Sequence, residues 1–154
     1  MEYGALTRLS AEETLAGLQA ALQAEIQAVA DYSRHAHAVP QAEIGETLST
    51  LAGVEREHAR RLTQRITVLG GKPSQDRPTA HSTGESLADW LAHDLKGEQW
   101  AIVEYARLVA GIMGDDETAE LMAELLRDEI RHARWLKATL LTVEKGERNP
   151  VTIR

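Results

Sequence analysis

The sequence has no cysteine and no phenylalanine, and aromatic residues make up only 4% of its 154 positions. The absence of cysteine excludes disulfides, zinc ribbons, iron–sulfur clusters and thiol nucleophiles. The composition, poor in aromatic residues and rich in alanine and leucine, favours helices over strands. A hydrophobic fraction of 43% and a charged fraction of 27% are typical of a globular protein. We therefore expect one helical domain spanning residues 1–154.

Two further absences concern location and partners. No uncharged stretch approaches the roughly 18 residues that a membrane span needs, so no membrane association is expected. The N-terminal segment MEYGALTRLSAEETL has no basic region followed by an apolar run, so we expect no signal peptide and a cytoplasmic location. A net charge of −7 argues against nucleic acid as a partner, whereas an acidic surface attracts cations.

Apolar residues recur at spacings of three and four along most of the chain, which predicts long amphipathic helices. Helix-start signals stand at Ser10, in the capping-box pattern SAEE, and at Ser82, in the pattern STGE. Asp115 or Asp116 is placed to cap the last helix. The expected helices cover residues about 10–38, 41–69, 84–109 and 115–145, followed by an irregular tail at 146–154.

The connection between the second and third helices is long, at residues 71–84. Fully extended, it reaches roughly 46 Å, and helices of this size measure roughly 40 Å. The connection can therefore cross from one end of a bundle to the other. The predicted fold class is all-α: a four-helix bundle with one long crossover, which makes helices two and three parallel.

The two halves of the chain repeat each other. Residues 22–34 (LQAEIQAVADYSR) align without gaps with residues 95–107 (LKGEQWAIVEYAR). Residues 51–62 (LAGVEREHARRL) align in the same way with residues 125–136 (LLRDEIRHARWL). The sequence therefore predicts two copies of one helical hairpin.

Polar residues that match between the two copies interrupt the apolar stripes at mid-height of the helices. Four carboxylates and two imidazoles are expected to meet in the core: Glu25, Glu55, His58, Glu98, Glu129 and His132. An isolated buried carboxylate costs several kcal/mol, and four together repel one another. Two divalent cations would neutralise them. Oxygen-rich ligands with one imidazole per ion suit Fe²⁺ or Mn²⁺, and Zn²⁺ would bind too.

At these residues the sequence resembles the ferritin-like di-iron carboxylate family, in which two helices each give a Glu and the other two each give Glu-x-x-His. The string Asp128-Glu129-Ile130-Arg131-His132 has the Asp-Glu-x-Arg-His form common in di-iron oxidases. The resemblance runs from about residue 10 to 145. It is strongest to bacterioferritins, in a haem-free form, or to rubrerythrin-type bundles. It implies a ferritin-like fold and two iron ions, with Mn or Zn as substitutes.

The resemblance also implies roles for individual residues. All six core residues would be metal ligands, and Glu55 and Glu129 would bridge the two ions. Tyr32 sits where bacterioferritins have a tyrosine near the di-iron centre, and it is our candidate catalytic residue, a one-electron donor. Tyr105 is interpreted as a core tyrosine. Asp128 is either a surface charge or, as we prefer, the acceptor for the free N–H of His58.

The sequence departs from the bacterioferritin pattern in three places. Arg56 stands where bacterioferritins have their haem-ligating methionine, so no haem is expected. Thr50 and Val54 replace the His and Asp that help to pass iron inward in some members. The tail beyond Lys145 is short for a fifth helix. A homo-oligomer is expected, but these departures leave open whether it is a dimer or a larger shell.

The expected function is that of a ferroxidase-type oxidoreductase, which oxidises Fe²⁺ with O₂ or H₂O₂ for iron detoxification or storage. The sequence leaves two alternatives open: a rubrerythrin-like peroxide reductase, and a non-catalytic structural module stabilised by metal. The remaining histidines, His35, His37, His81 and His93, are expected to be solvated and to take no part.

Overall fold

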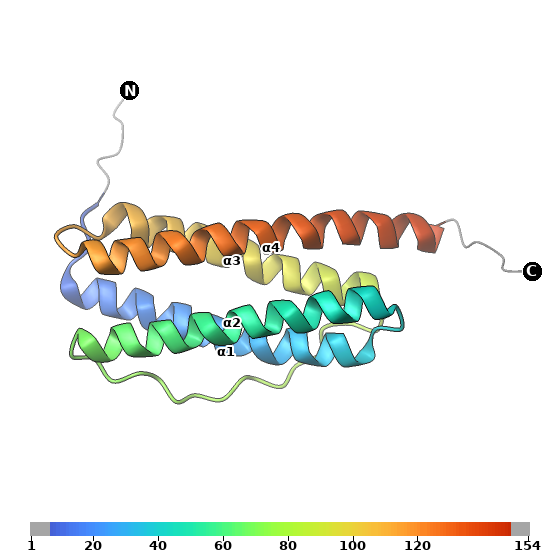
Figure 1. The fold of residues 1–154 in the computed structure, drawn as a ribbon, viewed down its shortest axis with the longest axis horizontal. Helices are drawn as coiled ribbons and strands as arrows, with labels where there is room; N and C mark the ends of the chain where they lie inside the picture. The colour runs from blue at the N-terminus through green and yellow to red at the C-terminus, as the bar shows by residue number, and fades with distance from the viewer. Residues whose placement is uncertain (1–6, 149–154) are drawn as a thin grey trace, which may run out of the picture.

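The computed structural model describes residues 7–148, which form four long helices (Figure 1). Their bounds are α1 Ala11–Ala38, α2 Ala42–Val68, α3 Leu87–Gly111 and α4 Asp116–Arg148. The last helix thus extends past the expected end at Lys145, and residues 149–154 of the predicted tail lie outside the described part. None of the described helices is both long and apolar enough to cross a membrane.

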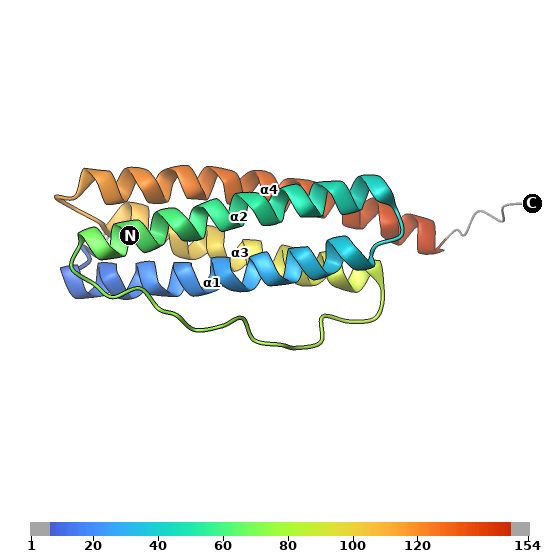
Figure 2. The same cartoon turned by 60° about the horizontal axis from the view of Figure 1, so that its bottom comes forward.

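The helices are arranged as two antiparallel hairpins packed side by side. α1 packs mainly on α2, and α3 mainly on α4, with a further interface between α1 and α3. The α2–α3 connection runs the length of the bundle beside α1, so α2 and α3 point the same way (Figures 1 and 2). The predicted all-α bundle with one crossover is therefore confirmed.

The helix starts show which capping signals act. Ser10 forms the predicted capping box with Glu13. The third helix begins later than expected, because its N-cap is Ser86, whose hydroxyl accepts from the backbone N–H of Asp89 at 3.1 Å. The predicted cap at Ser82 is wrong for a physical reason. Gly84 has φ +103°, a left-handed conformation that an α-helix cannot include.

The crossover is tied to α1 by side chains that replace missing backbone partners. The amide of Gln19 donates to the carbonyl of Lys72 at 2.6 Å and accepts from the N–H of Ser74 at 2.9 Å. Two turns further on, Gln27 holds both backbone groups of Thr79, accepting from its N–H at 2.7 Å and donating to its carbonyl at 3.1 Å. The connection is therefore fixed in place along α1.

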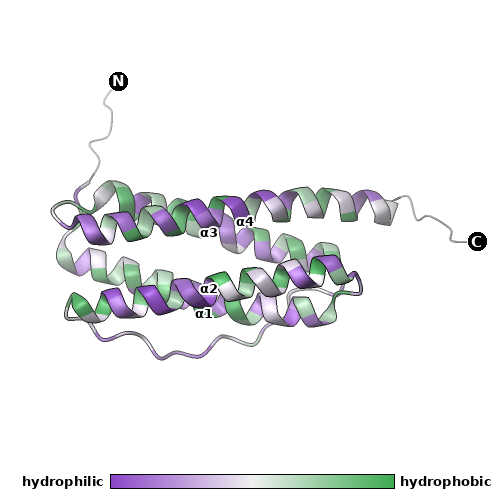
Figure 3. Ribbon diagram, in the orientation of Figure 1, coloured by the Kyte–Doolittle hydropathy of each residue, from purple (hydrophilic) through white to green (hydrophobic). Residues whose placement is uncertain are grey.

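The core consists of two apolar clusters, one towards each end of the bundle. One includes Leu18, Leu22, Leu62, Ile66, Leu108, Met122 and Leu125. The other includes Leu48, Leu51, Leu91 and Leu136. Along every helix, a stretch between the two clusters carries buried polar residues, and hydrophilic segments at mid-length are visible in Figure 3. This polar layer is where the functional residues predicted from the sequence lie.

Candidate metal centre

The polar layer contains all six predicted ligands. Each is nearly inaccessible to solvent, with Glu55 completely buried and His132, the most accessible, only 6% exposed. The helical spacing explains the convergence. Glu55 and His58 lie one turn apart on α2, as do Glu129 and His132 on α4, while α1 and α3 each contribute one glutamate.

The six side chains form two overlapping groups, each able to hold one metal ion. In each group, the potential ligand atoms lie within 4.8 Å of one another. Glu25 and His58 belong to one group only, and Glu98 and His132 to the other, whereas Glu55 and Glu129 are shared. The shared pair therefore has the position that bridging carboxylates require.

The Nδ1 atoms of both histidines face carboxylates without being hydrogen-bonded to them. Nδ1 of His58 lies 2.8 Å from Glu129 Oε1 and 3.2 Å from Glu55 Oε2. Nδ1 of His132 lies 2.7 Å from Glu55 Oε1. Despite these short distances, both nitrogens and both Glu55 oxygens lack a partner in hydrogen-bonding geometry. Orphaned buried donors and acceptors are costly, and their convergence on one point is what a metal ion between them would resolve.

The two histidines differ on their outer sides. Nε2 of His58 lies 2.9 Å from a carboxylate oxygen of Asp128, the residue expected to accept its N–H. Asp128 is also held by Arg131 at 3.1 Å. Among the described residues, none is hydrogen-bonded to Nε2 of His132, and Val54 occupies the repeat position that corresponds to Asp128. The two halves of the centre are therefore not equivalent.

Two buried tyrosines connect the halves of the repeat. The hydroxyl of Tyr32 donates to Glu98 at 2.5 Å, and that of Tyr105 donates to Glu25 at 2.6 Å. Burial and the neighbouring carboxylates raise the pKa of both hydroxyls well above 10. Both tyrosines therefore remain protonated and orient the terminal carboxylates. The sequence predicted Tyr32 near the centre. Tyr105 lies equally near, because its hydroxyl donates to the corresponding glutamate of the other half.

Without metal, raised pKa values keep protons on several side chains of this layer. Burial raises the pKa of Glu129, and Glu98 raises it further, to about 8. Burial lowers the pKa of His132, but the carboxylates of Glu129 and Glu55 outweigh that effect and raise it to about 12. The same opposition raises the pKa of His58 strongly. Because metal ligands must be deprotonated, an incoming cation would displace these protons.

The expectation that the other histidines are solvated is wrong for His35. That residue is only 1% exposed, and its Nδ1 lies 2.7 Å from the buried carboxylate of Asp94. His81 and His93 are each one-third exposed but engaged, since both face Asp31. His37 is exposed, as predicted. The spacing of three and four between buried positions on α1 could have identified His35, which lies one turn beyond Tyr32.

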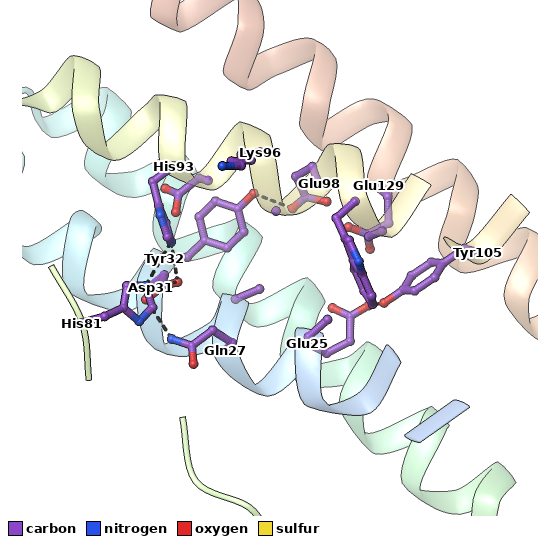
Figure 4. Close-up of a pocket in the computed structure, with 16 residues that line it drawn as sticks. Glu25, Gln27, Asp31, Tyr32, His81, His93, Lys96, Glu98, Tyr105 and Glu129 are labelled. Atoms are coloured by element: carbon purple, nitrogen blue, oxygen red, sulfur yellow. Dashed lines mark hydrogen bonds and ion pairs between the residues drawn. The ribbon is translucent and has the colours of Figure 1, made fainter. Parts of the chain in front are cut away.

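A cleft of about 410 Å³ leads from the surface to this layer. Its lining includes Glu25, Glu98 and Glu129 at the inner end and Asp31, His81 and His93 at the other (Figure 4). The cleft would give a small cation access to side chains that are otherwise enclosed.

A four-helix bundle with one crossover and two symmetry-related Glu-x-x-His groups defines the class of ferritin-like carboxylate bundles. The comparison with known families agrees: the model of the ferritin-like domain, "Ferritin", matches residues 15–145. The chain therefore belongs to the ferritin family.

Individual relatives are bacterioferritins or related to them. A bacterioferritin from Brucella melitensis is 33% identical over 96 residues, a match that spans 60% of this chain and 60% of that protein. Among solved structures, the bacterioferritin-related dodecameric thioferritin of Bacteroides fragilis has a TM-score of 0.78 at 23% identity, covering 94% of both chains. Rhodobacter capsulatus bacterioferritin has a TM-score of 0.79 at 24% identity, covering 90% of this chain and 89% of that one. These structural similarities establish the fold.

Proposed function

We propose that this protein binds two Fe²⁺ ions in the polar layer and oxidises them with O₂ or H₂O₂. The observation that carries the proposal is the set of six buried side chains in two overlapping groups, whose Nδ1 nitrogens and several carboxylate oxygens are left without hydrogen bonds. Zn²⁺ or Mn²⁺ would occupy the same ligands. Membership of the ferritin family and similarity to bacterioferritins support the choice of iron.

In this reaction Fe²⁺ is the substrate. Two Fe²⁺ ions give up one electron each, and O₂ takes both electrons with two protons to form H₂O₂, so charge and atoms balance. Four ionised glutamates neutralise the four positive charges of the two incoming ions. The protons displaced from the ligands when the ions enter leave the layer through the cleft or pass to the reduced oxygen.

The residues of the polar layer would have different roles in binding the two ions. Glu55 and Glu129 would bridge the ions, while Glu25 with His58 and Glu98 with His132 would complete the two halves. Tyr32 and Tyr105 hold the terminal carboxylates, and Asp128 fixes the ring of His58. The apolar clusters would exclude water from the two ends of the layer, which leaves the cleft as its route of access.

Stopped-flow absorbance after mixing aerobic apoprotein with Fe²⁺ tests this proposal. We expect a rapid ferric signal whose amplitude reaches two ions per chain, followed by slower turnover when Fe²⁺ is in excess. A signal limited to the rate of iron oxidation in buffer would overturn it and would favour a structural module. A single burst without later turnover would favour a peroxide reductase that awaits an external electron donor.

We also propose that the protein works as a homo-oligomer. The Bacteroides fragilis relative is described as dodecameric, and this chain shares its fold. Native mass spectrometry separates a dimer from a larger shell. A shell would add storage of the oxidised iron to its oxidation, whereas a monomer in that experiment would contradict the proposal.

A further inference from the structure

Three potential metal ligands meet at the outer end of the cleft, away from the six core residues. They come from three different elements: Asp31 from α1, His81 from the crossover, and His93 from α3. Nε2 of His93 lies 3.0 Å from Oδ2 of Asp31, and Nε2 of His81 lies 3.8 Å from the same oxygen. The two ring nitrogens are 3.3 Å apart. Figure 4 shows the three side chains directed towards one another.

These separations match those within a metal coordination sphere. Ligand atoms at about 2.0–2.2 Å from a tetrahedral ion lie roughly 3.3–3.6 Å from each other, and at an octahedral ion somewhat closer. The three measured distances bracket that range. A single cation placed between the three atoms would therefore need only small side-chain adjustments.

The hydrogen bonds of His81 leave its Nε2 free to bind a cation. Its Nδ1 lies 3.0 Å from the carbonyl of Thr79, and because a carbonyl only accepts, Nδ1 carries the proton. In the neutral ring, Nε2 then holds a lone pair. A backbone carbonyl on the far nitrogen is the arrangement usual for metal-binding histidines.

Hydrogen bonds also orient the carboxylate of Asp31 for binding a cation. Although its side chain is nearly buried, its Oδ1 accepts from Gln27 at 3.1 Å and from Arg34 at 3.0 Å. These donors leave Oδ2 directed at the two imidazoles. Gln27 also clamps both backbone groups of Thr79, so a single α1 residue positions the aspartate and the loop that carries His81.

We propose that Asp31, His81 and His93 form a mononuclear site for a divalent transition-metal ion. Two imidazoles and one carboxylate suit Fe²⁺, Co²⁺ or Zn²⁺, and the open side of the site faces the cleft, where water or a further ligand completes the coordination. The site shares no ligand with the core layer, so it is independent of the proposed ferroxidase centre. Its ion lies at the end of the cleft opposite Glu98 and Glu129.

Anaerobic equilibrium dialysis with Co²⁺ alone tests the proposal. We expect three ions per chain for the native protein and two for His81→Ala, with His37→Ala as the matched control that keeps three, since His37 is an exposed histidine of α1. Gln27→Ala, which removes the clamp, should weaken the third ion by roughly 10- to 100-fold. Equal stoichiometry in native protein and His81→Ala would overturn the site.

A second variant separates this proposal from the proposed function. Glu55→Ala/Glu129→Ala removes the carboxylates shared by the core groups and should retain one Co²⁺, which disappears when His81→Ala is added. If the native protein binds only one ion and His81→Ala loses it, the mononuclear site stands and the dinuclear centre falls. If the Glu55→Ala/Glu129→Ala variant is folded by circular dichroism but binds none, the mononuclear site falls.

Discussion

The hydroxyl of Tyr32 in α1 donates to Glu98 in α3 at 2.5 Å, and this bond has a counterpart in the other half of the repeat. There the hydroxyl of Tyr105 in α3 donates to Glu25 in α1 at 2.6 Å. The two bonds cross the bundle in opposite senses. Each hairpin thus orients the terminal carboxylate of the other, and the paired tyrosines offer matched variants.

Tyr32→Phe and Tyr105→Phe should each lower the free energy of unfolding by about 1–3 kcal/mol, because each leaves a buried carboxylate without a donor. Only Tyr32 is proposed to donate an electron: when H₂O₂ is reduced to two water molecules, one Fe²⁺ supplies the first electron and Tyr32 the second, with the phenolic proton passing to Glu98. Frozen samples taken after mixing with Fe²⁺ and O₂ should show a tyrosyl radical by electron paramagnetic resonance in Tyr105→Phe but not in Tyr32→Phe. An unchanged radical in Tyr32→Phe would assign the signal elsewhere.

Glu129→Ala should abolish rapid Fe²⁺ oxidation and preserve the helical circular dichroism spectrum. Glu129 belongs to both metal groups, so its removal disrupts both, whereas without an ion the burial of its carboxyl group is costly to the folded state. At a Zn²⁺ concentration of about 100 times Kd, a site present only in the folded state adds about 2.7 kcal/mol of stability. The variant should lose most of this gain.

Glu120→Ala, at an exposed position of the same helix, is the control for that variant and should behave as the native protein does. A loss of helicity in Glu129→Ala, measured without metal, would mean that the six residues mainly hold the fold together.

Asp128→Ala should weaken one of the two core ions and spare the other. Its carboxylate is the acceptor for Nε2 of His58 at 2.9 Å, and loss of such an outer partner typically costs 10- to 100-fold in metal affinity. Arg131→Gln is the matched control, since Arg131 also contacts Asp128 but points into solvent. In the His81→Ala background, which lacks the proposed third ion, Co²⁺ titration followed by visible absorption should resolve two affinities when Asp128→Ala is added. Equal weakening of both ions would contradict the proposed asymmetry.

The sequence was sufficient to predict that the six side chains meet in the core, because two independent regularities agree on them. The repeat pairs Glu55 with Glu129 and His58 with His132, and helical spacing places all of them at mid-height. Burial of a charged residue needs a compensating partner, so the pattern itself pointed to cations. The structure brings these residues together, as expected from helix geometry alone.

The features that the sequence did not reveal depend on the path of the crossover. Helix α3 begins after Ser86 and not after Ser82, because Gly84 between them has a positive φ. The pattern of capping residues does not predict that backbone conformation. Likewise, Gln27 fixes Thr79 against α1, and His81, two residues further on, lies beside His93. Long-range contacts made by an irregular segment carry no periodic signal, and so this cluster appears only in three dimensions.

Stability without metal should fall as pH rises from about 6 to 9, and metal should oppose this trend. Glu129 has a pKa of about 8 in the folded chain against a usual value of 4.5, so between these values the folded state holds a proton that the unfolded state releases. His132, with a pKa of about 12 against 6.5, contributes stability that is complete below 6.5 and is lost as pH rises towards 12. Both groups therefore lower the free energy of unfolding as pH rises.

Urea denaturation at a series of pH values, with a chelator or with buffered Zn²⁺, measures these slopes. The metal-dependent gain should grow with pH, because the ligands bind only when deprotonated. In Glu129→Gln, which has no proton to lose at that position, the metal-free slope should become shallower below pH 8. A metal-free stability that increases through this window would show that the layer does not retain its protons in the folded state, and that its carboxylates are ionised before any cation enters.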